Sequence, residues 1–304
     1  MKAARLVEWG KPLQLEDIPR PQPAEDQVLV RVRAASINPF DHAIQAGYLK
    51  GMASIPLTLG ADFSGEVVSV GPNVTGYEPG DAVYGVSPLG GGTFAEYVVV
   101  KSSELARKPA TLDFECAAGV GLPAMAAWIS LYDTAGLKGP ERVLVHGVAG
   151  NVGSLVLQFA KMEGAYVYGT DRPEKADHAR ELGIDHFVPS TERFETHVKD
   201  VDVVIDLVGG DLMERSYGVL KRGGCYVTSL LVEPPQEEPR RRGIRSLGLA
   251  AYPRADVLGK VAGLIDAGKI HTFIDRVFPL EDVNHAMAYR AESRRHGKVV
   301  LRVQ

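Results

Sequence analysis

The sequence predicts an α/β protein with two domains, one a barrel-like all-β domain and the other a doubly wound domain with a parallel sheet. Three observations support this fold class. The chain has 304 residues, of which 45% are hydrophobic and 24% charged, which is enough for two separate cores. Residues 1 to about 120 contain short β-branched runs, and from about 121 to 252 strand and helix patterns alternate.

The all-β region contains four clear strand candidates. β-branched and aromatic residues fill residues 28–33, 65–70, 81–85 and 94–100. Turn residues separate these runs, namely Gly71-Pro72, Pro79-Gly80 and the glycine triplet 90–92. Short strands punctuated in this way predict a barrel-like unit.

The following region alternates between strands and helices. Apolar strands are predicted at 142–146, 165–169, 201–205 and 225–229, and helices at 155–161 and 174–182. This alternation predicts a parallel, doubly wound sheet. The segment 233–243, which carries three consecutive arginines, is expected to be an exposed loop with its arginines in solvent.

The last fifty residues predict a helix at 255–267, a strand at 274–278, a second helix at 283–292 and a strand at 298–302. We expect the C-terminal strands to return to the first domain, because domain termini often lie close together. The expected domains are therefore 1–120 with 253–304, and 121–252.

Composition narrows the class of partner. The formal net charge is −4 and no basic stripe is visible, so neither nucleic acid nor a membrane surface is expected to bind, and a small molecule is. No apolar run reaches membrane-spanning length and the N-terminus does not resemble a signal peptide, which predicts a cytoplasmic protein. The two cysteines, Cys116 and Cys225, lack metal-site spacing and are expected to be buried thiols.

The strongest motif is a glycine turn that comes directly after the predicted strand 142–146. It comprises Gly147, Gly150, Asn151, Val152 and Gly153, and a helical stretch follows at once. Glycines allow a tight turn, so that backbone N–H groups and the helix N-terminus can approach a pyrophosphate closely. The motif predicts dinucleotide binding, and the alternative is a turn that serves only helix–strand packing.

The end of the next strand carries conflicting signals about the cofactor. Asp171 lies 18 residues beyond Gly153 (171 minus 153), where an acidic residue binds the ribose hydroxyls of NAD. Arg172 and Lys175 could instead hold the 2′-phosphate of NADP. A third interpretation of Asp171 is an N-cap of the following helix.

Two further strand ends are expected to contact the cofactor, because the carboxyl ends of strands line the crevice in doubly wound sheets. The residues concerned are Leu207, Gly209, Ser229 and Leu230.

Several motifs together match one family over the whole chain. They are the segments 35–41, 59–65, 80–83, 93–97, 147–153, 270–283 and 297–301. The sequence resembles the zinc-free quinone oxidoreductases (zeta-crystallin-like) of the medium-chain dehydrogenase/reductase superfamily. The resemblance implies a GroES-like β-barrel catalytic domain, a Rossmann-type cofactor domain, NADP(H) and commonly a homodimer that pairs through a strand at about 245–252. It also places Lys298 close to the cofactor, although a lysine in solvent at the start of a strand is the alternative.

The resemblance also implies that no zinc is bound. In the zinc-dependent alcohol dehydrogenases, a ligand cysteine stands where this chain has Asn38, and a His-Glu pair stands at Ala61-Asp62. Without a metal, oxidation of an alcohol loses its means of forming an alkoxide. Reduction of an electrophilic carbonyl compound, such as a quinone or an enone, is still possible without a metal. The resemblance also implies that Asp41 and Asp62 are structural or cleft-shaping residues.

Hydride addition to such a substrate needs a donor that stabilises the negative charge growing on its oxygen. Asn38 is the first candidate and Tyr48 the second. Asn38 could instead bond a turn, and Tyr48 could be a packed aromatic residue. Gln45 and Ala126 replace an arginine and a threonine that the family often has, which leaves a catalytically weak nucleotide-binding or regulatory protein as the rival interpretation.

Overall fold

The computed structural model describes all residues except 90, 230–232, 293–295 and 304. The chain divides into two compact units, Met1–Leu122 with Tyr252–Gln304, and Pro123–Ala251. The predicted cofactor contact at Leu230 lies outside the described residues. None of the helices in the described part of the chain is long and apolar enough to cross a membrane.

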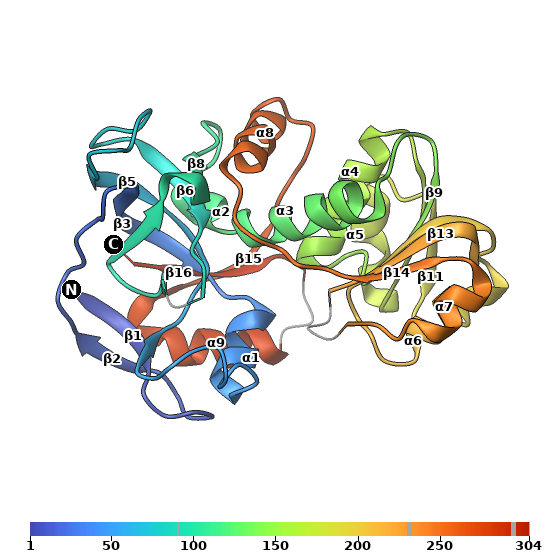
Figure 1. The fold of residues 1–304 in the computed structure, drawn as a ribbon, viewed down its shortest axis with the longest axis horizontal. Helices are drawn as coiled ribbons and strands as arrows, with labels where there is room; N and C mark the ends of the chain where they lie inside the picture. The colour runs from blue at the N-terminus through green and yellow to red at the C-terminus, as the bar shows by residue number, and fades with distance from the viewer. Residues whose placement is uncertain (90, 230–232, 293–295, 304) are drawn as a thin grey trace. The chain divides into compact units, whose positions relative to one another are not determined.

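The first unit contains two sheets that are largely antiparallel, drawn in blue and teal with the C-terminal strands in red (Figure 1). The larger sheet has the order β15-β16-β3-β5-β6-β8, with β7 also paired to β3, and the smaller has the order β2-β1-β4. Their bounds are β1 Lys2–Leu6, β2 Gln14–Asp17, β3 Gln27–Ser36, β4 Leu57–Thr58, β5 Asp62–Val70, β6 Ala82–Val86, β7 Tyr97–Lys101, β8 Leu105–Arg107, β15 Ile274–Pro279 and β16 Lys298–Arg302. These sheets form the GroES-like domain.

Strand β3 organises this unit because it pairs with three others, β5, β7 and β16. Its apolar run is almost wholly buried, and the valines, leucines and phenylalanines of its neighbours form one core with it. β16 lies antiparallel to β3, with Val300 opposite Ser36. This pairing brings the start of β16 beside the segment that follows β3.

The helices of the first unit are short, and they flank the sheets (Figure 1). Their bounds are α1 Pro39–Ala46, α2 Phe114–Ala118, α8 Ala255–Asp266 and α9 Val283–Glu292, with 3-10 turns η1 Ser102–Glu104 and η5 Leu280–Asp282. Helix α1 begins at Pro39, whose missing N–H is not needed in a first turn, and is followed by Gly47 in the left-handed conformation, with φ of 88°. Helix α3 (Gly121–Trp128) begins at the end of this unit's first segment.

The second unit is a six-stranded parallel sheet with the order β11-β10-β9-β12-β13-β14. This order is that of the Rossmann-type fold, with its reversal point between β9 and β12. The strands are β9 Arg142–His146, β10 Tyr166–Asp171, β11 His186–Pro189, β12 Val201–Asp206, β13 Leu220–Thr228 and β14 Arg245–Gly248. The α/β fold class predicted from the sequence is thus confirmed.

Helices cover both sides of this sheet, and Figure 1 shows α4 and α6 on opposite sides of it. The bounds are α4 Asn151–Met162, α5 Ala176–Glu181, α6 Leu212–Tyr217 and α7 Glu237–Arg242, with η2 Ile129–Ala135, η3 Pro173–Lys175 and η4 Phe194–Thr196. The eight buried residues of α4, from Gly153 to Ala160, pack it firmly against the strands.

The prediction of a loop at 233–243 is wrong in part, because α7 forms there. Pro239 stands at the third helical position, where its missing N–H has no partner within the helix in any case. Glu238 forms ion pairs with Arg241 and Arg242 three and four residues further on, which favours the helix. The side chains of Arg241 and Arg242 are 74% and 45% exposed, and Arg240 is exposed as well, as predicted.

Candidate functional site

The glycine turn of the second unit joins β9 to α4. Gly147 has a φ of 79°, and Gly150 is the residue that precedes α4. A Cβ on Gly153 would lie 2.1 Å from the carbonyl oxygen of Gly147, so the helix can cross the turn this closely only with glycine there. The amides of Asn151, Val152 and Gly153 form the first turn of α4 and have no carbonyl four residues earlier within the helix.

The preceding amides of the turn are fixed by the end of β10. Gly147 and Val148 donate to the carbonyl of Thr170, at 2.8 and 3.2 Å, and Ala149 donates to Oδ2 of Asp171 at 3.0 Å. The other carboxylate oxygen of Asp171 accepts from the amide of Arg172. Asp171 therefore holds the glycine turn, and the N-cap interpretation is wrong because no amide of the following helix bonds to its carboxylate.

A pocket of about 430 Å³ opens beside this turn within the second unit. Its wall contains three residues predicted as cofactor contacts, Gly147, Asp171 and Arg172. Seven more line it that were not predicted, namely Thr170, Ser190, Glu192, Phe194, Val208, Leu212 and Arg215. Lys175 is buried and is not among the residues that line this pocket.

The loop after β12 is held by a buried carboxylate. Asp206 accepts from the amides of Val208 and Gly209 through Oδ1 and from the Tyr226 hydroxyl through Oδ2. Its own carbonyl accepts from the amide of Ser229. These bonds place the predicted contacts Leu207, Gly209 and Ser229 together at the carboxyl ends of β12 and β13, and their binding to a cofactor stays a prediction.

A buried histidine, His146, is hydrogen-bonded to Thr170, one of the residues that line the pocket. Nδ1 of His146 lies 2.7 Å from the Thr170 hydroxyl, and Nε2 lies 2.9 Å from the Ser216 hydroxyl. Because Ser216 already donates to the carbonyl of Leu212, its oxygen accepts from His146, which places the imidazole proton on Nε2. Burial lowers the pKa of His146 to about 4, although Asp206 opposes the shift. This histidine is satisfied locally.

We expect His146 to stay neutral, with its proton on Nε2, down to about pH 5, one unit above its pKa. Its folded-state pKa lies below the ordinary value of 6.5, so the unfolded chain binds the proton more readily between the two values. The contribution of His146 to the free energy of unfolding is therefore full above pH 6.5 and is lost as the pH falls towards 4. Imidazole ¹⁵N shifts measure this, and an imidazolium signal from His146 at pH 6 would contradict it.

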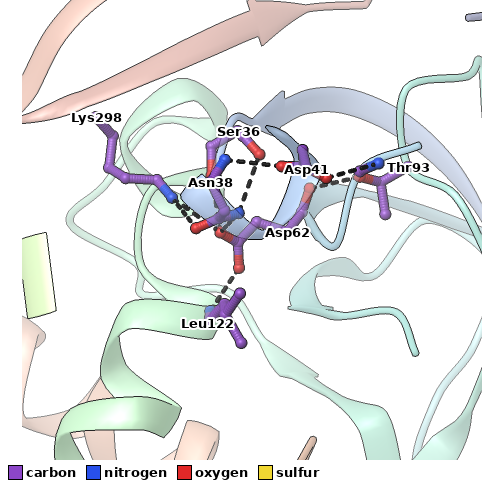
Figure 2. A network of polar contacts seen from close by, with 8 residues as sticks. Ser36, Asn38, Asp41, Asp62, Thr93, Leu122 and Lys298 are labelled. Carbon is purple, nitrogen blue, oxygen red and sulfur yellow. Dashed lines mark hydrogen bonds and ion pairs between the residues drawn. The ribbon is translucent and has the colours of Figure 1, made fainter. Parts of the chain in front are cut away.

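A second polar cluster lies in the first unit, where β3 passes into α1 (Figure 2). Asn38, 4% exposed, donates from Nδ2 to the carbonyl of Ser36 at 3.3 Å and to Oδ2 of Asp62 at 2.9 Å. Lys298 approaches from the start of β16, and its Nζ donates to Oδ1 of Asn38 at 2.6 Å and to Oδ2 of Asp62 at 3.1 Å. The three side chains form a closed triangle of hydrogen bonds.

The carboxylate of Asp62 is the centre of this cluster. Besides Asn38 and Lys298, it accepts from the Ser36 hydroxyl and from the amide of Leu122 in the first turn of α3. Lys298 is 2% exposed, so the alternative of a lysine in solvent is wrong. Burial lowers the pKa of Lys298, while the negative charge of Asp62 acts in the opposite direction.

Asp41 takes a structural position at the edge of the same cluster. It accepts from the amide of Asn38 at 2.7 Å and from the amide of Gly60 at 3.1 Å. Burial raises the pKa of Asp41 to about 7, against the opposing effects of these hydrogen bonds and of Lys298. The carboxyl group ties the start of α1 to the segment before β5, which agrees with the structural role expected for it.

Tyr48 does not join this cluster. It follows α1 and is 81% exposed, so the alternative of a packed aromatic residue is wrong. Its role as a hydrogen-bond donor stays a prediction. Gln45, which replaces the arginine often found in the family, donates from its side chain to the carbonyl of Lys11.

Comparisons with known proteins agree with this architecture. Residues 24–110 match the model of the alcohol dehydrogenase GroES-like domain, and residues 182–301 match that of the zinc-binding dehydrogenases. The quinone oxidoreductase of Sus scrofa is 30% identical to the chain, with 99% of this chain and 97% of that protein covered. The chain belongs to the medium-chain dehydrogenase/reductase superfamily.

Within the superfamily, the chain is quinone oxidoreductase-like. The crystal structure of the quinone oxidoreductase from Coxiella burnetii is 31% identical and superimposes with a TM-score of 0.91, covering 100% of this chain and 99% of that one. A mitochondrial NAD(P)H oxidoreductase of Mus musculus is 31% identical, with 91% of this chain and 82% of that protein covered. The protein is therefore an oxidoreductase of this superfamily.

The residues present do not fit the zinc ion that the name of one matching family model implies. The family resemblance places Asn38 and Ala61-Asp62 at the ligand positions of the zinc-dependent enzymes, and Nζ of Lys298 is bonded to Asn38 and Asp62. A cation that already neutralises the carboxylate opposes the binding of a second cation there. In the described part of the chain, no three His, Cys, Asp or Glu side chains gather closely enough to hold a metal.

The residues of the second unit do fit the nicotinamide nucleotide that the superfamily implies. The first-turn amides of α4 offer donors for a pyrophosphate, and Asp171 and Arg172 on the pocket wall can meet an adenosine ribose. When bound, such a nucleotide supplies a hydride. The glycine turn is the part of this chain that would hold and orient it.

Proposed function

We propose that the protein transfers hydride from a reduced nicotinamide nucleotide to a quinone or an α,β-unsaturated carbonyl compound without using a metal ion. The observation that carries this proposal is the Lys298 ammonium bonded to Asn38 and Asp62, two positions that the family resemblance assigns to metal ligands in the zinc-dependent enzymes. The glycine turn supports a retained hydride source, and the Lys298 contacts support replacement of the Lewis acid.

The lack of a fitting metal donor set among the described residues supports a substrate that is already electrophilic. Oxidation of an ordinary alcohol needs an alkoxide, which the metal of zinc enzymes generates by lowering the pKa of the bound hydroxyl. An enone or a quinone is already electrophilic and needs only a donor for the charge that develops on its oxygen. The names of the pig and Coxiella relatives support a quinone as one acceptor.

Steady-state turnover tests this function directly. The purified protein is incubated with NADPH or NADH and a panel of quinones and enones, and loss of the nicotinamide absorbance is followed. We expect turnover that a chelator does not reduce. Tight nucleotide binding with no turnover of any acceptor would favour the rival regulatory role, and one zinc ion per chain would overturn the metal-free part of the proposal.

We further propose NADPH as the preferred cofactor, in line with the resemblance. Arg172 lies on the pocket wall with its side chain 44% exposed and 3.8 Å from the carboxylate of Glu174, so it can turn to a 2′-phosphate. The carboxylate of Asp171 is engaged with the amides of Ala149 and Arg172, which directs part of its hydrogen-bonding capacity away from a ribose.

Asp171→Asn is expected to raise the ratio of kcat/KM for NADPH over NADH about tenfold, because it removes a negative charge near the 2′-phosphate and keeps one oxygen for the turn. Asp171→Ala should shift the ratio similarly but weaken both nucleotides, since the amide of Ala149 loses its acceptor. Asp177→Asn, at a side chain that is 90% exposed, is the control. A ratio for Asp171→Asn equal to that of the control would refute the charge argument.

A homodimer is the proposed assembly. β14 lies at the end of the six-stranded sheet and pairs only with β13 among the described strands, so its outer edge offers backbone donors and acceptors to a second copy. Light scattering coupled to size-exclusion chromatography should give twice the chain mass of 32.8 kDa. A mass of one chain at micromolar concentration would contradict the dimer.

A further inference from the structure

The buried cluster of the first unit contains very few hydrogen-bond donors that a substrate oxygen could use. Asn38 has two amide hydrogens, and both are engaged, one with the carbonyl of Ser36 and one with Asp62. The Ser36 hydroxyl donates to Asp62 as well. The contacts therefore leave Asn38 no free hydrogen for the direct donor role predicted from the sequence.

Lys298 is different because an ammonium carries three hydrogens. Asn38 accepts one and Asp62 accepts a second. No hydrogen bond from the third to any described residue is present. One N–H of this buried ammonium thus has no hydrogen-bond acceptor among the described residues.

The backbone holds this ammonium in place. Gly297, directly before it, has a φ of 105°, and a Cβ there would lie 2.7 Å from the amide nitrogen of Asp275 in β15. β16 then pairs with β15 on one side and β3 on the other. The Lys298 side chain is consequently directed to the junction of β3 and α1, where Asn38 lies (Figure 2).

We propose that Lys298 is the catalytic donor of the reaction, and that Asn38 and Asp62 are positioning residues that hold its ammonium. This inference rests on the proposed function. The hydride adds with its electron pair to the β-carbon of the enone, the π electrons move to the carbonyl oxygen, and the third N–H of Lys298 stabilises the resulting negative charge. A proton from solvent then completes the product, so one hydride and one proton are added in total.

Burial lowers the pKa of Lys298, and the nearby charges act on it in both directions. Asp62 is in direct contact, and Asp41 acts from the start of α1, while Arg290 of α9 acts in the opposite direction. In this proposal the Lys298 ammonium stabilises the oxyanion of the substrate. A metal ion acting as a Lewis acid has this electrostatic role in the zinc enzymes.

The first test compares Lys298→Met and Lys298→Arg with Lys101→Met, a control at the exposed end of β7 in the same unit. We expect Lys298→Met to lower kcat about 100-fold or more, the usual effect of removing one oxyanion donor, while the Kd of NADPH changes less than about threefold. Lys298→Arg should recover part of kcat, and Lys101→Met should match the wild type. An unchanged kcat in Lys298→Met, or a rise in the Kd of NADPH that accounts for the whole loss, would overturn the proposal.

Asn38→Ala tests the positioning role. Loss of Oδ1 frees the ammonium to move, so kcat should fall about tenfold while the Kd of NADPH and the KM of the acceptor stay within about threefold. A merely structural asparagine would lower the melting temperature without this change in kcat, and that result would count against a positioning role.

A second readout does not depend on turnover. Added p-nitrophenol mimics the oxyanion, and its absorbance reports ionisation directly. We expect the wild-type protein with NADP⁺ to lower the apparent pKa of bound p-nitrophenol, and Lys298→Met to abolish that shift. Equal titration curves for the two proteins would overturn the inference. Because this measurement needs no hydride transfer, the inference and the proposed function can fail separately.

A double variant serves as the control for misfolding of Lys298→Met. Lys298→Met leaves Asp62 as an unpaired buried anion, so the double variant Asp62→Asn with Lys298→Met removes both charges. It should fold and show the same loss of kcat. A folded double variant with wild-type kcat would contradict the role of Lys298.

Discussion

Replacement of Gly153 by alanine is expected to weaken the binding of reduced nicotinamide nucleotides by about 100-fold, which corresponds to about 3 kcal/mol. The new Cβ would lie 2.1 Å from the carbonyl oxygen of Gly147 and 2.8 Å from the Cα of Val148. Both are backbone atoms, so the turn must move rather than a side chain. The first-turn amides of α4 would then no longer face the pyrophosphate together.

Isothermal titration calorimetry with NADPH and NADH measures this loss. The matched control is Gly263→Ala, at an exposed position within α8 where an added Cβ meets no atom within 4 Å. It should leave nucleotide affinity unchanged and raise stability by about 0.5–1 kcal/mol, because alanine favours the helix. Wild-type affinity in Gly153→Ala would show that the glycine serves packing alone and would remove the basis of the assignment.

Asp62→Ala is expected to lower the free energy of unfolding by about 3–5 kcal/mol. The substitution leaves the Lys298 ammonium buried without its counter-charge. It also removes the acceptor for the Ser36 hydroxyl and for the amide of Leu122. Unpaired buried donors and an uncompensated charge are each costly, so the effects act in the same direction.

Urea denaturation measures this change in the free energy of unfolding. Glu66→Ala, in the same strand, is the control. Glu66 forms a half-buried ion pair with Arg33, and its loss should cost at most about 1 kcal/mol. The double variant Asp62→Leu with Lys298→Met should regain much of the stability, because neither buried charge remains. Equal losses for Asp62→Ala and Glu66→Ala would contradict the interpretation of a buried, closed cluster.

The strands and the glycine turn were predictable because their signals are local. The strand predicted at 142–146 is β9, and the alternation that follows it predicted the parallel sheet correctly. α4 begins at Asn151 rather than near 155, because Gly153 within its first turn disguises the start of the helix. Only a tertiary constraint, the close crossing over Gly147, explains a glycine at that position.

The pocket was predicted only in part. β11 was missed, because the four residues His186–Pro189 end in proline and lack an alternating pattern. Ser190 and Glu192, which follow β11, were therefore not recognised as lining residues. Parallel pairing of β11 with β10 brings them beside Asp171, and no local signal in the sequence gives that neighbour.

The sequence by itself determined the two-domain α/β architecture and the dinucleotide turn, because hydrophobic periodicity and glycine spacing act over a dozen residues or fewer. Tertiary structure alone decided what Asn38, Asp62 and Lys298 do together. Lys298 is 260 residues from Asn38 and 236 from Asp62, and they meet only because β16 pairs with β3. Side-chain hydrogen bonds depend on distances of about 3 Å. For residues so far apart in the sequence, these distances are set by the pairing and register of the strands, which no local pattern specifies.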